Sequence, residues 1–123
     1  MVEIFLERAE QLARARQLMK EDVLYTAAIA LTAVHSAIAF NDALLVKLTG
    51  KHHPSQDHSK AAEHSEIACK SQKMDAAGLK HLKKLLSSKT KISYSAERTS
   101  ADQAEVLRLT SERFETWVTP LLK

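Results

Sequence analysis

The chain has 123 residues, a size that suits one domain with one helical core. Only two glycines and two prolines are present, and an aromatic content of 5% argues against a β-sandwich or β-barrel. The single cysteine excludes an intrachain disulfide, and the formal net charge is +3. We therefore expect one all-α domain over residues 1–123, in a cytoplasmic protein.

Apolar periodicity predicts five helices along the chain. Their expected ranges are 2–20, 21–49, 57–70, 74–96 and 99–119. The acidic pair Glu21-Asp22 suits the start of the second helix, and Gly50 suits its end. Thr99 and Asp102 form a capping box at the start of the fifth. The predicted fold is an up-and-down four-helix bundle with an additional short helix, the third.

The second predicted helix is apolar on several sides, which is typical of the central helix of a bundle. Its most apolar stretch, 25–40, is rich in alanine and includes Thr26, Thr32 and His35. A membrane span needs about 20 strongly apolar residues. We therefore interpret this stretch as a buried helix and expect no association with a membrane.

Three polar residues of this helix are candidates for buried side chains: His35, Asn41 and Asp42. The spacing of seven places His35 and Asp42 on one side of the helix. Buried polar groups must find hydrogen-bond partners. A hydrogen-bonded core network or a polar patch at a subunit interface explains them best, and a small polar site between helices is the alternative.

Four histidines cluster at His52, His53, His58 and His64. Imidazole binds zinc and nickel, but the spacing matches neither a His-Glu-x-x-His nor a Glu-x-x-His motif. We therefore predict no metal site and no cofactor, although a metal- or small-molecule-binding bundle stays an alternative. The chain also lacks a Gly-x-Ser-x-Gly elbow and a glycine-rich phosphate loop, which argues against hydrolase and nucleotide-loop chemistry.

Positive charge is concentrated in residues 70–98, where eight basic residues stand against two acidic ones. Such a segment attracts phosphates, although a solvated helix face has the same composition. Near its end, Lys89, Lys91 and Arg98 are candidates to contact phosphate, and Tyr94 is a candidate to stack on a base. Helical spacing predicts that these side chains share one face.

From about Leu24 to Val118, the chain resembles the HEPN superfamily of small helical-bundle proteins. The resemblance rests on the long alanine-rich helix, the polar loop, the leucine-rich helix ending in 89–94, and the capped last helix with Trp117. Many members have an Arg-x4-6-His motif near the end of the penultimate helix. In ribonuclease members these residues are implicated in metal-independent RNA cleavage, usually across a homodimer.

The matching stretch has Lys89 in place of the arginine and Tyr94 in place of the histidine. Tyrosine exchanges a proton poorly at neutral pH, and lysine lacks the planar fork of arginine. The resemblance thus implies a non-enzymatic RNA/nucleotide- or protein-interaction module that forms a homodimer. Its partner would be RNA or a nucleotidyltransferase-type protein, as in toxin–antitoxin or defence systems. A metal-independent ribonuclease with a Lys–Tyr site is the alternative.

Overall fold

The computed structural model describes residues 1–51, 58–94 and 96–123, without the side chains of Ser59 and Tyr94. The α-helices are α1 (Val2–Leu18), α2 (Thr26–Thr49), α3 (His58–Ser71), α4 (Leu79–Tyr94) and α5 (Ala101–Val118), and the short 3₁₀ helices are η1 (Val23–Tyr25) and η2 (Thr119–Leu122). No strand occurs among the described residues, so the all-α prediction is confirmed.

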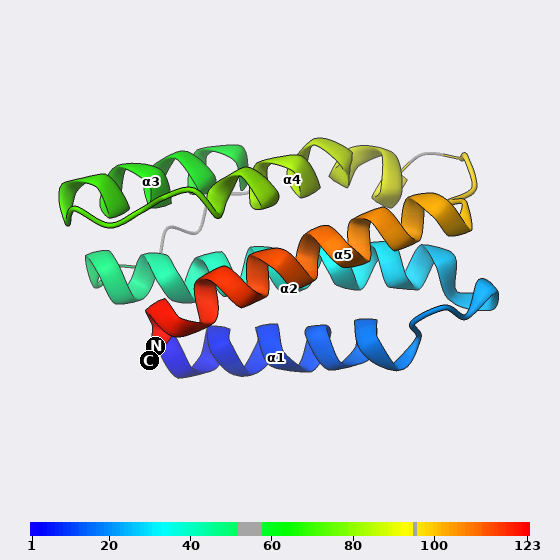
Figure 1. Cartoon of the computed structure of the whole chain (residues 1–123), viewed down its shortest axis with the longest axis horizontal. Coiled ribbons are helices and arrows are strands. Elements are labelled where there is room, and N and C mark those ends of the chain that lie inside the picture. The colour runs from blue at the N-terminus through cyan, green and yellow to red at the C-terminus, as the bar shows by residue number, and fades with distance from the viewer. Residues whose placement is uncertain (52–57, 95) are drawn as a thin grey trace.

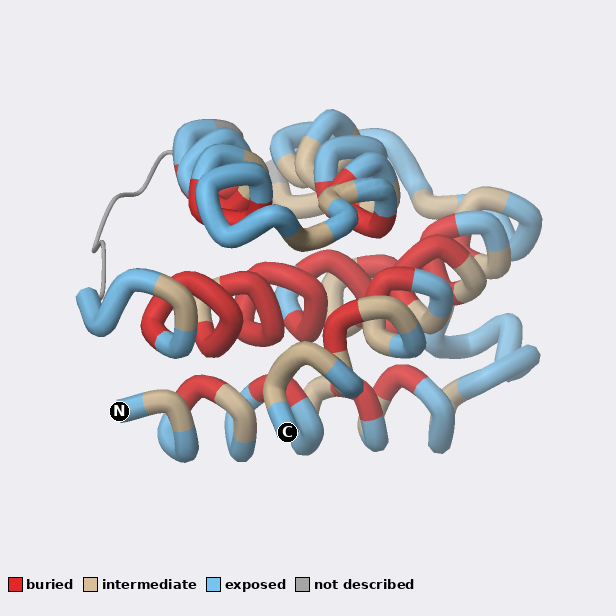
Figure 2. Tube along the Cα trace, turned by 60° about the vertical axis from the view of Figure 1, so that its left-hand side comes forward, coloured by how far each residue is buried: buried red, intermediate tan, exposed pale blue. Residues whose placement is uncertain are grey.

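The central helix is α2, and each of the other four α-helices packs against it. The chain runs along α1 and returns in the opposite direction along α2, while α5 crosses a second side of α2 (Figure 1). The helices α3 and α4 lie side by side over a third side (Figure 2). Figure 2 also shows that buried residues follow α2 over most of its length.

Most apolar side chains of α2 are buried inside the protein. Its buried residues include Ala33, Val34, Phe40 and Leu44. By length and composition alone, the segment Val23–Thr49 is apolar enough to cross a membrane, and half of its most apolar window is buried among the other helices. A helix surrounded by packing partners has the same composition, so the apolar character of α2 is explained by its central place in the core.

The start of the long helix differs from the prediction. The carboxylate of Asp22 accepts a hydrogen bond from the Leu24 backbone N–H at 2.9 Å, and this cap begins the one-turn helix η1. The α-helix α2 therefore starts only at Thr26. Its end is as expected: Gly50 has a left-handed φ of 73°, and its N–H donates to the Val46 carbonyl at 2.8 Å.

The fourth and fifth helices are also shorter than predicted. Helix α4 begins at Leu79 and not near 74, because the Met74 N–H donates to the Cys69 carbonyl at 2.8 Å and closes the end of α3. The cap of α5 is Ser100 and not Thr99, since the Ser100 hydroxyl accepts from the Gln103 N–H at 3.1 Å.

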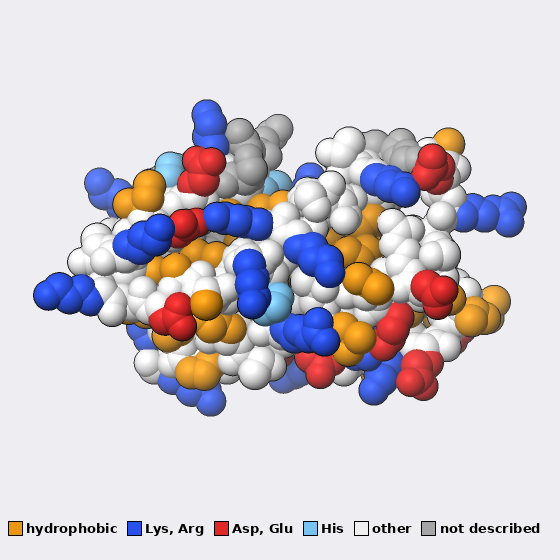
Figure 3. All heavy atoms as spheres, turned by 45° about the horizontal axis from the view of Figure 1, so that its top comes forward, with side chains coloured by type: hydrophobic (Ala, Val, Ile, Leu, Met, Phe, Trp, Pro, Cys, Tyr) orange, Lys and Arg blue, Asp and Glu red, His pale blue; other side chains and the backbone are white. Residues whose placement is uncertain are grey.

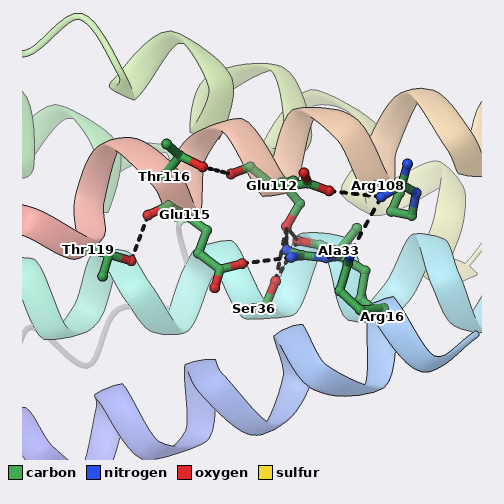
Figure 4. A network of polar contacts seen from close by, with 10 residues as sticks. Arg16, Ala33, Ser36, Arg108, Glu112, Glu115, Thr116 and Thr119 are labelled. Atoms are coloured by element: carbon green, nitrogen blue, oxygen red, sulfur yellow. Dashed lines mark hydrogen bonds and ion pairs between the residues drawn. The ribbon is translucent and has the colours of Figure 1, made fainter. Parts of the chain in front are cut away.

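A buried arginine joins α1, α2 and α5 (Figure 4). The side chain of Arg16 on α1 is only 1% exposed, and its Nη1 donates to the Ser111 hydroxyl on α5 at 2.8 Å. Its Nη2 donates to Glu115 Oε1 at 2.6 Å. The Ser111 hydroxyl in turn donates to the Ala33 carbonyl on α2 at 2.7 Å and lies 3.0 Å from the Ser36 hydroxyl. One charged side chain therefore ties the first and last helices to the central one.

A second arginine extends this network. Arg108 on α5 is 4% exposed and donates to both carboxylate oxygens of Glu105, at 2.9 and 2.6 Å, and to Glu112 at 2.8 Å. The amide oxygen of Gln17 accepts from Arg16 at 3.1 Å and from Arg108 at 3.3 Å. No buried side-chain polar atom among the described residues lacks a hydrogen-bond partner. The two cations are thus fully compensated.

Replacing Glu115 by alanine should destabilise the protein more than replacing Glu112 by alanine. Glu115→Ala leaves the buried charge of Arg16 without a carboxylate and should cost about 2 kcal/mol. Glu112→Ala leaves Arg108 with its two bonds to Glu105, so a loss under about 1 kcal/mol is expected. Both changes remove one glutamate from the same helix. Urea unfolding followed by circular dichroism measures the difference, and equal losses would contradict the role given to Arg16.

Candidate nucleic-acid interface

Helix α4 has two chemically distinct faces. One face is buried through leucines, of which Leu79, Leu82 and Leu85 are almost completely inaccessible. The rest of the helix has five lysines and no acidic residue, namely Lys80, Lys83, Lys84, Lys89 and Lys91. Figure 3 shows Lys and Arg side chains gathered over the face that α3 and α4 form. Packing of the leucines against α2 and α5 therefore directs a row of cations outward.

Two cations of this face are neutralised by Glu66 on α3. The carboxylate of Glu66 accepts from Lys70 at 3.0 Å and also pairs with Lys83. Hydrogen bonds from Lys83 and Lys70 lower the pKa of Glu66 to about 2. Glu66 is therefore ionised at every pH above that value and removes part of the positive potential on this face.

The predicted contact residues lie at the far end of α4, and the structure does not bring all of them together. Helix α4 ends at Tyr94 and a bend follows at 96–97, so the helical i,i+4 relation expected between Tyr94 and Arg98 is wrong. Lys91 pairs with Glu97 at 3.3 Å. Arg98 is exposed, and the side chain of Tyr94 lies outside the described part of the chain.

The charge of Lys89 on α4 acts on His35 of α2. The prediction of a buried His35 is wrong, because its side chain is exposed beside α4. Partial burial and the charge of Lys89 lower the pKa of His35 below its ordinary value. An imidazole of this kind is mostly neutral at pH 7, in contrast to the Lys89 ammonium beside it.

Asn41 and Asp42 do not form a ligand site. Asn41 is 2% exposed, and its amide oxygen accepts from the buried Ser65 hydroxyl at 2.6 Å. Asp42 is half-buried. The hollow that these two residues share with His58 and Ala61 is too small to admit a water molecule. The core-network interpretation therefore fits Asn41, and there is no room here for a small molecule.

A second cationic group was not found from the sequence. Burial and then the charges of Lys80, Arg113 and Lys84 lower the pKa of His81. Arg113 belongs to α5, and helical periodicity within α4 contains no information about it. The only sequence signal was its place one turn before Trp117, on a stripe that adjoins the apolar face of α5.

No metal site is found in the described part of the chain. No three His, Cys, Asp or Glu residues there are close enough to hold a metal ion, and His52 and His53 lie outside the described residues. A groove of about 630 Å³ between α1 and α5 is lined by residues that include Glu10, Arg14, Arg16 and Glu115. Its charges are mixed, and Glu115 already neutralises Arg16.

Comparison with protein-family models, with curated proteins and with solved structures found no match.

Replacing Lys89 by glutamine should raise the pKa of His35 toward its ordinary value of about 6.5, because one of the two causes of its depression is removed. Lys91→Gln, which removes a charge that is paired with Glu97, is the matched control and should leave His35 unchanged. NMR titration of the imidazole measures both. The pKa of His35 is lower in the folded state than in the unfolded state. The free energy of unfolding should therefore also fall as the pH drops below the pKa of the histidine in the unfolded chain. An identical pKa of His35 in the parent and in Lys89→Gln would contradict the electrostatic effect of Lys89 on His35.

Proposed function

We propose that this protein is a non-enzymatic, HEPN-like up-and-down helical bundle that binds RNA through the basic outer face of α4. The observation that carries the proposal is the composition of α4, which has five lysines and no acidic residue around a buried leucine stripe. Four of the five are exposed, and Lys89 is half-buried. Exposed lysines in a row attract a phosphate backbone without reading its sequence. The residues Lys89 and Lys91, with Arg98 beyond the helix end, extend this surface.

The proposal includes a cytoplasmic homodimer. Its support is a group of exposed apolar side chains at the end of the bundle where α1 leads into α2. Leu18, Val23 and Leu24 are 87%, 72% and 84% exposed, and Tyr25 is 48% exposed. Exposed apolar groups of this kind are typical of contact surfaces. They lie at the opposite end of α1 from the chain termini, which is also the end of the molecule where α4 ends (Figure 1).

A metal-independent ribonuclease is the second candidate. The observation that favours it is His35, which supplies beside Lys89 the neutral imidazole that the Lys89–Tyr94 stretch lacks. A neutral imidazole can accept the proton of an RNA 2′-hydroxyl, while an adjacent ammonium attracts the phosphate. This candidate differs from the first in one observable: the RNA is cut.

The test is one titration of labelled single-stranded and structured RNAs with the full chain, without added metal. We expect intact RNA, binding at low salt, and a steep loss of affinity as salt rises. Glu66→Gln should tighten binding by about threefold, because it releases Lys70 and Lys83. Glu7→Gln on α1 removes the same charge elsewhere and is the control.

Three outcomes would overturn the proposal or change its form. Absence of binding at low salt would remove RNA as the ligand and leave a protein partner, such as the nucleotidyltransferase-type protein that the resemblance suggests. Equal effects of Glu66→Gln and Glu7→Gln would show that α4 is not the contact surface. Cleavage that disappears in His35→Gln or in Lys89→Ala/Tyr94→Phe would establish the ribonuclease instead.

A further inference from the structure

Three cations from two packed helices, α4 and α5, lie near one histidine of α4. Lys80 and Lys84 are one turn apart on α4, so they share a face, and His81 lies at its half-buried edge. Arg113 reaches the same place from α5, and all three charges act on His81.

A close helix contact sets the position of Arg113. Gly78, just before α4, is covered by Trp117, and a Cβ added at Gly78 would lie 2.0 Å from the indole ring. The absence of a side chain at Gly78 therefore allows α5 to approach the start of α4 closely. Arg113 is one turn before Trp117, and α5 runs opposite to α4 (Figure 1). This register places Arg113 beside the first turns of α4, so its position follows from the core packing of Trp117 on Gly78.

These cations differ from Lys70, Lys83 and Lys91 because they are not neutralised by a carboxylate. Lys70 and Lys83 share Glu66, and Lys91 pairs with Glu97. Across the described ranges, no ion pair joins Lys80, Lys84 or Arg113 to a carboxylate. Like charges held together repel one another, and an anion placed between them removes that repulsion.

We propose that Lys80, His81, Lys84 and Arg113 form a phosphate-binding site. The planar guanidinium of Arg113 offers two parallel N–H donors to phosphate oxygens, and the two ammonium groups add charge from the opposite side. His81 adds a ring N–H. Phosphate oxygens of this kind belong either to an RNA backbone or to the phosphate chain of a free nucleotide. That the bound phosphate belongs to RNA rests on the proposed function, whereas the existence of the phosphate site does not.

The test uses the full chain and the variant Lys80→Gln/Arg113→Gln. Arg14→Gln/Lys20→Gln removes one lysine and one arginine from the other side of the molecule and is the control. Each protein is titrated with inorganic pyrophosphate and, separately, with a short labelled single-stranded RNA. The single tryptophan, Trp117, adjoins the site and reports pyrophosphate binding by fluorescence, with calorimetry as a second readout. Circular dichroism melting confirms that all three proteins are folded, as the exposure of the replaced residues leads us to expect.

The parent should bind pyrophosphate, and Lys80→Gln/Arg113→Gln should weaken that binding by about tenfold or more, because charge-assisted hydrogen bonds are lost. The affinity of the control for pyrophosphate should remain within about twofold of that of the parent.

If Lys80→Gln/Arg113→Gln also weakens RNA binding and the control does not, the RNA backbone is a source of the phosphate. Pyrophosphate binding without RNA binding supports the site but overturns RNA as the ligand. Equal RNA affinity of the parent and Lys80→Gln/Arg113→Gln, with no pyrophosphate binding, overturns the site and leaves the proposed function standing.

Discussion

The buried guanidinium of Arg16 is the interaction on which the arrangement of the helices depends most. It lies at the contact of α1 with α5, and its partners Ser111 and Glu115 come from the last helix of the chain. A buried charge is tolerated only where every donor finds an acceptor, so this contact permits few alternative packings. Through the bond from Ser111 to the Ala33 carbonyl, it also fixes α5 against α2. The orientation of α5 follows from this network.

That orientation determines which residues of α5 face α4. With one side of α5 held by Arg16, its other side meets α4, where Trp117 covers Gly78 and Arg113 faces the first lysines of α4. Burial of the α4 leucines then turns the remaining lysines outward. The basic face is therefore a consequence of how the core packs, and it combines residues that are distant in the sequence. Lysines neutralised by Glu66 and Glu97 adjoin lysines that are not, which divides the face into regions of different positive potential.

The helices could be predicted from the sequence because their apolar periodicity is local, whereas the site could be predicted only in part. The stop at Gly50 and the central place of α2 follow from nearby residues. The close approach of α5 to the start of α4 depends on Trp117, which lies about 40 residues downstream of Gly78. The residues near Arg16 in the sequence do not indicate that its side chain is buried. Its burial depends on acceptors that lie 95 and 99 residues away. Arg113 was missed for the same reason, since no spacing rule within α4 connects it to Lys80.

The central claim is that RNA contacts the α4–α5 side of the bundle, and NMR mapping tests it most directly. A short single-stranded RNA is added at low salt to the ¹⁵N-labelled full chain, and amide shifts are followed residue by residue. We predict that the largest changes fall in 80–84 and around Arg113, while the amides of α1 remain unchanged. Changes centred on α1 or on residues 18–25, or no changes at all, would contradict this account.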